Sequence, residues 1–195
     1  KLGAQNMFWA DSGAFTGEVS WRELKNFGVK YCIIGHSERR INLGETDEMV
    51  NKKVKIALEQ GLSPVLCVGE RERVGNEIPP VVGEQLKIAL KGVRKSLLKN
   101  LVVAYEPLWA ISTQTNARPT TPDNAFRAGL YLKKIITGLY DRKTGEKVRI
   151  IYGGSVNAQN VYSFLKEGKM QGVLIGGASL LPEEFAKIIA LASRL

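Results

Sequence analysis

The sequence contains one histidine, two cysteines and no long apolar run. A helix that crosses a bilayer needs about 20 consecutive apolar residues, and no such run occurs, so we expect no membrane partner. Zinc sites usually combine several His and Cys ligands, so the single His36 argues against a metal. Cys32 and Cys67 lie within the apolar runs YCII and VLCV, as buried thiols do. Without a disulfide framework, the expected location is a reducing cytoplasm.

Positive charge exceeds negative charge: 28 Lys and Arg stand against 19 Asp and Glu, a net charge of +9. The basic residues are dispersed between helical apolar positions, as in KKVKIALEQ, which is typical of solvated helix faces. There is no zinc-finger spacing and no RNA-binding aromatic signature, so we expect no nucleic-acid partner. Attraction of an anionic substrate is the functional alternative to a merely basic surface.

Six short apolar runs, rich in β-branched residues, end in polar or glycine residues. They are continuously apolar rather than alternating, which predicts strands buried on both faces of a parallel sheet. The runs cover residues 2–6, 31–35, 63–69, 101–106, 148–153 and 172–177.

Helical periods lie between these runs. One covers residues 46–61, with the expected inward residues Val50, Val54, Ala57 and Leu58. A second begins at Thr121-Pro122-Asp123, with the expected inward residues Ala125, Leu130, Leu132, Ile135 and Ile136. Two more cover residues 157–168 and 181–193.

Repeated strand–helix units predict an α/β fold, for which two architectures compete. An open doubly wound sheet usually shows a Gly-rich phosphate loop after its first strand, and neither GxGxxG nor GxxxxGK[ST] occurs. Instead, functional groups follow nearly every run: Asn6, His36, Glu70, Glu106, Gly153–Ser155 and Gly176–Gly177. Such groups at many strand ends favour a (β/α)8 barrel, which we predict as one domain over residues 1–195.

Two side chains at strand ends could carry chemistry. His36 is the only histidine and could act as a general acid or electrophile; the alternative is a structural histidine. Glu106 ends a buried run, where an unpaired carboxylate is desolvated and becomes a stronger base. The alternative for Glu106 is an ion pair with one of the arginines.

The loop after Glu106 combines apolar and polar residues. Pro107 stiffens its start, and Trp109 and Ile111 could cover the base and exclude water. The glycine pairs Gly153-Gly154 and Gly176-Gly177 follow the last two runs, where backbone N–H groups of a barrel commonly hold phosphate. Together, base, imidazole and phosphate loops suit proton abstraction next to a carbonyl in a small phosphorylated compound.

Four motifs, IIGHSERR, AYEPLWAI, IIYGGSVN and GVLIGGASL, occur in this order, and AQNMFWADSGAFTGEVS lies near the start. Together they closely resemble the triosephosphate isomerase family over the whole chain. The resemblance implies a barrel enzyme that interconverts dihydroxyacetone phosphate and D-glyceraldehyde 3-phosphate in glycolysis and gluconeogenesis. It also implies a homodimer that needs no cofactor and no metal.

The resemblance further implies roles for single residues. Glu106 would be the base, His36 the neutral electrophile and Glu38 a supporting acid, with Cys67 a buried structural neighbour. The substrate phosphate would lie on the backbone of Ser112, Ser155, Gly176 and Gly177. The lid would comprise Pro107, Leu108, Trp109, Ala110, Ile111, Ser112, Thr113, Gln114, Thr115, Asn116 and Ala117. The dimer contact would comprise Phe15, Thr16, Gly17 and Glu18, with Thr16 reaching toward the partner's active site.

The sequence departs from the family pattern in two places. The family begins with two further βα units, whose first strand supplies an asparagine and a lysine to the substrate. We therefore expect strands three to eight of the barrel here, an incomplete N-terminus, and activity only in the full-length protein. The stretch STQTN, residues 112–116, replaces a glycine- and lysine-containing lid hinge. Two rival interpretations remain open: an inactive barrel fragment or pseudoenzyme that binds phosphometabolites or acts as a scaffold, and another phosphate-binding barrel enzyme.

Overall fold

A parallel sheet of five strands forms the centre of the molecule. The computed structural model describes residues 1–75, 77–111 and 118–195. The strands are β1 (Gly3–Ala4), β2 (Tyr31–Ile34), β3 (Ser63–Val68), β4 (Val102–Tyr105) and β5 (Arg149–Tyr152). Their spatial order, β1-β2-β3-β4-β5, repeats their order in the chain. A doubly wound sheet reverses its order at a switch point, so this order agrees with the predicted barrel winding.

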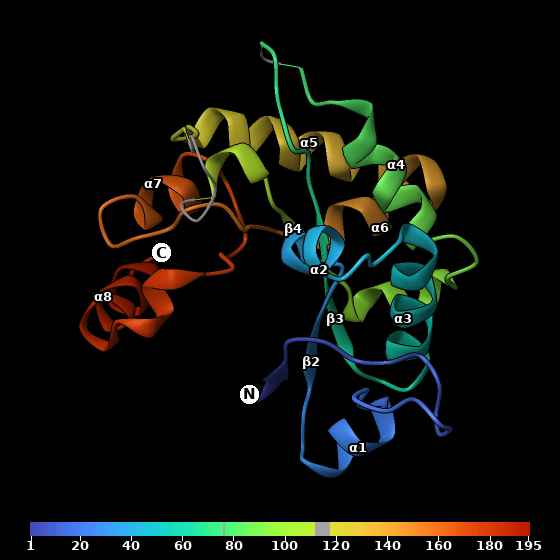
Figure 1. Cartoon of the computed structure of the whole chain (residues 1–195). Helices are drawn as coiled ribbons and strands as arrows, with labels where there is room; N and C mark the ends of the chain where they lie inside the picture. Colours follow the sequence, from blue (N-terminus) through green and yellow to red (C-terminus); the bar gives the residue numbers. More distant parts are fainter. Residues whose placement is uncertain (76, 112–117) are drawn as a thin grey trace.

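The helices follow one another around the sheet, in an arc that Figure 1 shows from α1 through α3, α4 and α5 to α7 and α8. Successive helices α3, α4 and α5 contact each other, as do α7 and α8. Among the helices of the described residues, none combines the length and apolarity needed to cross a membrane. The bounds are α1 (Trp21–Asn26), α2 (Ser37–Asn42), α3 (Asp47–Glu59), α4 (Pro80–Ala89), α5 (Pro122–Leu139), α6 (Arg142–Lys147), α7 (Val161–Lys166) and α8 (Pro182–Ala192).

The predicted helix start at Thr121 agrees with the cap of α5, and α3 begins with a cap of the same kind. The hydroxyl of Thr46 accepts the Met49 N–H at the start of α3, and that of Thr121 accepts the Asn124 N–H at the start of α5. The four inward residues predicted for α3 are all buried. In α5 one prediction was wrong: Leu130 is 52% exposed, because the face of the helix that carries it meets solvent rather than the sheet.

The two faces of the sheet have different partners. Cys32, Leu66, Val103, Tyr105 and Ile150 belong to the large core formed with the helices. On the other face, Cys67, Ala104 and Ile151 stand side by side across β3, β4 and β5. Because both faces carry apolar side chains, the strands read as continuous apolar runs rather than alternating ones.

The sixth apolar run does not form the full strand that we expected over residues 172–177. It forms only an isolated parallel bridge between Tyr152 and Val173. Two hydrogen bonds hold it, from Tyr152 N–H to Gly172 O at 3.1 Å and from Leu174 N–H to Tyr152 O at 2.8 Å. Among the described residues, no further strand pairs with its other edge.

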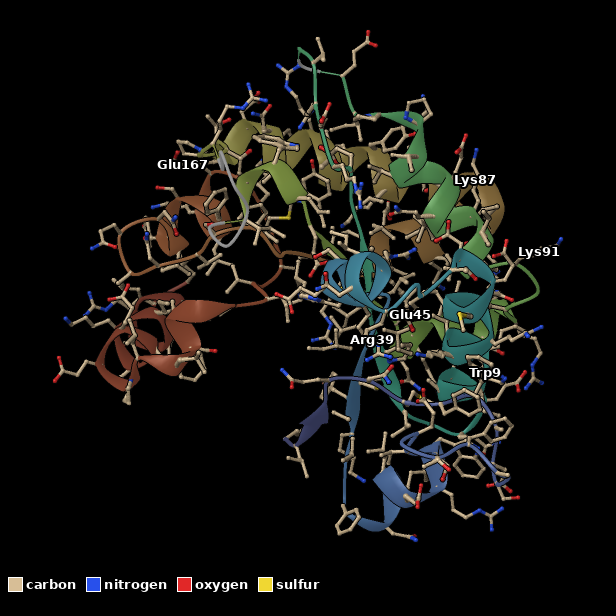
Figure 2. The ribbon with its side chains drawn as sticks, in the orientation of Figure 1. Trp9, Arg39, Glu45, Lys87, Lys91 and Glu167 are labelled. Carbon is tan, nitrogen blue, oxygen red and sulfur yellow. The ribbon has the colours of Figure 1, made fainter. Side chains whose placement is uncertain are left out.

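A buried charged network fixes the segment after β1 to α3. The Lys53 ammonium donates to Asn6 Oδ1 at 2.7 Å and pairs with the Glu45 carboxylate. Arg39, at the end of α2, lies with Nε 3.4 Å from the second Glu45 oxygen, and Figure 2 shows these two side chains side by side. The Lys53 and Glu45 side chains are each only 3% exposed. Because little water reaches either side chain, each charge depends on the other for its electrostatic stabilisation.

Replacing Lys53 by methionine roughly keeps the length of the side chain but leaves the buried Glu45 carboxylate with Arg39 as its partner. Removing one partner of a buried ion pair costs about 3–5 kcal/mol, so we expect a loss of about that size in the free energy of unfolding, measured by urea titration. The matched control is Arg142→Met, which breaks an exposed pair with Glu146 and should leave stability unchanged. A Lys53→Met protein as stable as its parent would show that the network contributes no net stability.

Candidate functional site

Four of the residues singled out in the sequence follow consecutive strands at one edge of the sheet: His36, Glu70, Glu106 and Gly153. The ladder continues past the strand ends, since Glu106 N–H donates to Val68 O and Gly153 N–H donates to Tyr105 O, both at 2.8 Å. Parallel strands place their carboxyl ends at the same edge. The fold therefore brings these side chains together although they are far apart in the chain.

The Glu106 carboxylate is buried, with 2% of the side chain exposed. One oxygen, Oε2, accepts the backbone N–H of Ser37 at 3.2 Å. The other, Oε1, lies 3.2 Å from Nε2 of His36. Among the described residues, no arginine lies within ion-pair distance, so the alternative of an Arg–Glu106 pair is not realised.

His36 is held by the helix that it begins. It is the N-cap of α2, and its Nδ1 accepts the backbone N–H of Glu38 at 3.3 Å. Because Nδ1 accepts a hydrogen bond, the proton of the neutral ring lies on Nε2, the nitrogen that faces Glu106. The Glu38 carboxylate is 4.0 Å from Nδ1 and largely exposed, so the main contact of Glu38 with the ring is through its backbone.

Burial raises the pKa of Glu106 above its ordinary value. The opposing influences, in order, are His36, the Ser37 N–H, the Cys67 thiol and Arg40, and they only partly offset the loss of hydration. Burial and the neighbouring Glu106 charge also raise the pKa of Cys67, so this thiol stays protonated. The carboxylate is thus a stronger base than an exposed glutamate.

Glu70 connects the start of the predicted lid to the sheet. Its Oε1 accepts the Tyr105 hydroxyl at 2.7 Å and the Trp109 indole N–H at 2.9 Å. Its backbone carbonyl accepts the Leu108 N–H at 2.9 Å. Pro107 precedes the short 3-10 turn Leu108–Ala110, in which Leu108 and Ala110 are buried. Ser112 and the lid residues 113–117 lie outside the described residues.

The loops expected to hold phosphate differ in whether their N–H groups are free. Ser155 donates both its N–H and its hydroxyl to Ala110 O, at 3.2 and 2.9 Å. Among the described residues, the N–H groups of Gly176 and Gly177 have no protein acceptor. The 3-10 turn Gly177–Leu180 follows directly, so these exposed N–H groups can donate hydrogen bonds to an anion.

A cavity of about 360 Å³ reaches Glu106 from the side of α2 and α4. Its lining includes Ser37, Cys67, Gly69, Gln85 and Glu106, but neither His36 nor the glycine loops. In the described part of the chain, no cluster of three or more His, Cys, Asp or Glu side chains could hold a metal ion.

The predicted dimer contact forms a turn that projects into solvent. Glu18 N–H donates to Phe15 O at 2.9 Å, and all residues from Phe15 to Glu18 are exposed. The Phe15 ring packs on Phe8, with centroids 4.5 Å apart, yet 47% of Phe15 remains exposed.

Sequence reasoning missed two contacts that support the site. Ser37 was named only as part of a motif, yet its N–H is the direct partner of Glu106. Glu70 was named only as a polar strand end, and its bond to Trp109 spans 39 residues. No local signal identifies either contact, because both depend on which loops the fold places together.

Comparison with known proteins gives a consistent result. The family model described as triosephosphate isomerase matches residues 1–192. Among curated relatives of that name, the protein of Thermoanaerobacter pseudethanolicus is 50% identical over 190 residues, which cover 96% of this chain and 75% of the relative. The protein of Dictyoglomus thermophilum is 47% identical over 191 residues, 97% of this chain and 76% of the relative. That of Aquifex aeolicus is 47% identical over 191 residues, with 97% and 75% covered.

The raised pKa of Glu106 predicts how stability depends on pH. Between the ordinary pKa of 4.5 and the higher folded value, the folded state binds more protons than the unfolded state, so stability falls as pH rises. Glu106→Gln removes this cost. We expect its melting temperature to exceed that of the parent by more at about pH 8 than at about pH 4. The control Glu59→Gln alters an exposed acid, and an equal pH response in both variants would contradict the assigned cause.

Proposed function

Because the chain belongs to the triosephosphate isomerase family, we propose that Glu106 and His36 perform its isomerisation of dihydroxyacetone phosphate and D-glyceraldehyde 3-phosphate. The observation that carries the assignment is the buried Glu106 carboxylate facing Nε2 of His36 at 3.2 Å. A base and a hydrogen-bond donor so close together can act on adjacent atoms of one small substrate.

The proposed reaction uses these two groups at the reacting atoms of the substrate. Glu106 takes a proton from the carbon beside the carbonyl, and the electron pair of that C–H bond forms the enediolate. The Nε2–H of His36 donates to the carbonyl oxygen as negative charge develops there. The hydroxyl proton of the substrate must also pass to the former carbonyl oxygen, and Nε2 of His36 would relay it by donating its own proton to one oxygen and taking the proton of the other. Glu106 then returns its proton to the neighbouring carbon, which completes the isomerisation. A raised pKa suits the base, because proton transfer is most effective when the pKa approaches the working pH.

Substrate must displace contacts that the free protein makes. The Ser37 N–H holds Glu106 Oε2, so the carboxylate has to leave this donor to reach a substrate carbon. Gly153 leaves space for that movement, because a Cβ there would lie 2.9 Å from Glu106 Cγ. Glycine at this position therefore supports a mobile base.

We assign substrate phosphate to the N–H groups of Gly176 and Gly177, together with those of Ser155 and Ser112. The free N–H groups at Gly176 and Gly177 support this assignment. Ser155 is bonded to Ala110 O, and Ala110 belongs to the proposed lid, residues 107–117. Phosphate would replace Ala110 O as the acceptor of Ser155, so phosphate binding would release the lid to close over the site.

The protein is further proposed to act as a homodimer in the cytoplasm. The exposed turn Phe15–Glu18 supports the dimer, since a half-exposed phenylalanine on a projecting loop is apolar surface available to a second copy. Two free, buried cysteines agree with a reducing compartment.

Turnover tests the base. General bases contribute about 10²- to 10⁴-fold to rate, so we expect kcat of Glu106→Gln in the full protein to fall by about that factor. Glu106→Asp retains a carboxylate but withdraws it, and should also lose activity. The exposed control Glu59→Gln should keep parental kcat. Normal turnover by Glu106→Gln would assign the base elsewhere.

The oligomeric state of a variant tests whether the turn Phe15–Glu18 is the dimer contact. Phe15→Asp places a charge in the proposed contact, and sedimentation velocity should show a shift from dimer to monomer. The matched control is Phe27→Asp, the same change at a phenylalanine 78% exposed after α1, which should leave the dimer intact. A dimeric Phe15→Asp protein would rule out this segment as the main contact.

A further inference from the structure

The carboxamide of Gln85, on α4, binds both backbone groups of one residue at the end of β3. Its Oε1 accepts the Gly69 N–H at 2.8 Å, and its Nε2 donates to Gly69 O at 3.1 Å. A side-chain amide has the same donor and acceptor as a peptide group. Gln85 therefore occupies the place that a neighbouring strand would otherwise take.

The position of Gly69 explains why such a substitute is needed. The last β3 residue paired with β2 is Leu66, because β2 ends and the chain turns into α2. On the other side, Val68 O and Glu70 O accept N–H groups from Glu106 and Leu108. Gly69, between them, points its own N–H and carbonyl to the side that β2 has left. Without Gln85, both groups would lack a protein partner in the described structure.

Gly69 also touches the backbone of Glu106. A Cβ at Gly69 would lie 1.8 Å from Glu106 O and 2.5 Å from Glu106 C. Its φ is not among the positive values, so glycine is required by close approach and not by backbone conformation. Any shift of the β3 end is therefore transmitted directly to the peptide that carries Glu106.

We propose that Gln85 is a positioning residue for Glu106: its two hydrogen bonds hold Gly69 against the Glu106 peptide and so fix where the carboxylate begins its movement. This inference rests on the proposed function only through the role of Glu106 as base. Gln85 does not touch the carboxylate in any contact that the structure shows, and it acts through Gly69. Its removal should impair the chemical step more than substrate binding, because the phosphate loops lie elsewhere.

The chain offers a matched control. Gln171 uses its side-chain Oε1 to accept the Ile150 N–H at 3.1 Å, at the opposite end of β5. Gln171→Ala therefore deletes the same side chain and a bond of the same kind to the same sheet, but away from Glu106. Gln85→Glu serves as a second variant of similar size, since it keeps an acceptor for Gly69 N–H but replaces the donor to Gly69 O by a charged carboxylate oxygen.

The test measures kcat, KM and melting temperature of Gln85→Ala, Gln85→Glu and Gln171→Ala in the full protein. Misplacing a catalytic group by about 1 Å can cost about 100-fold, so we expect kcat of Gln85→Ala to fall about 10- to 100-fold with KM nearly unchanged. Gln85→Glu should lie between parent and Gln85→Ala, and Gln171→Ala should retain parental kcat. Parental kcat in Gln85→Ala, or an equal loss in Gln171→Ala, overturns the proposal.

A second measurement does not depend on turnover. The Glu106 amide, bonded to Val68 O, should exchange its hydrogen faster in Gln85→Ala than in the parent, and at the parental rate in Gln171→Ala. Unchanged Glu106 exchange overturns the proposal even if the enzyme is active. An inactive parent, or an active Glu106→Gln, contradicts the proposed function instead, and amide exchange still decides the role of Gln85. If Gln85→Ala fails to fold, Gln85→Glu supplies both readouts.

Discussion

The desolvation of one carboxylate, Glu106, is the constraint on which the rest of the site depends. Withdrawing an ionised carboxyl from water is costly unless hydrogen bonds or opposite charges replace the lost hydration. Around Glu106 the protein replaces only part of the lost hydration. The partners of the carboxylate are one backbone N–H, one imidazole edge and one thiol, and no arginine lies within ion-pair distance among the described residues. A bidentate guanidinium would stabilise the charge more but would also make it a weaker base. The site therefore sacrifices stability to retain basicity.

The sequential order of the parallel strands brings the other groups of the site to the same edge of the sheet. Each βα unit contributes one group to the same edge: an imidazole after β2, a lid support after β3, the acid after β4 and a glycine loop after β5. The support for each group comes from a different unit than the group itself, as α2 supplies the N–H for Glu106. Correct chemistry thus depends on correct packing between units.

What the sequence could predict was local. The cap at Thr121, the buried positions in α3 and the acid at the end of β4 follow from neighbouring residues, and the structure has them there. The prediction that Leu130 faces inward was wrong, because the helical period alone does not say which apolar residue meets the sheet. The prediction of a full strand over residues 172–177 was wrong, since only Val173 pairs with β5 although the composition favours a strand. The contacts of Ser37 and Glu70 could not be predicted from the sequence, because they join loops that are distant in the chain. Motif resemblance identified the family without supplying these contacts.

The buried thiols have a consequence for how the protein responds to oxidants. Peroxide and alkylating reagents attack the thiolate, and burial raises the pKa of Cys32 to about 12 and that of Cys67 well above its ordinary value. Cys67 lies beside the base, where a bulky sulfinic or sulfonic group would displace Glu106. While the fold is closed, this reaction is suppressed because the raised pKa keeps the thiol protonated. Oxidative inactivation would then depend on local opening that returns water to the thiol, so its rate would report how often this part of the fold opens.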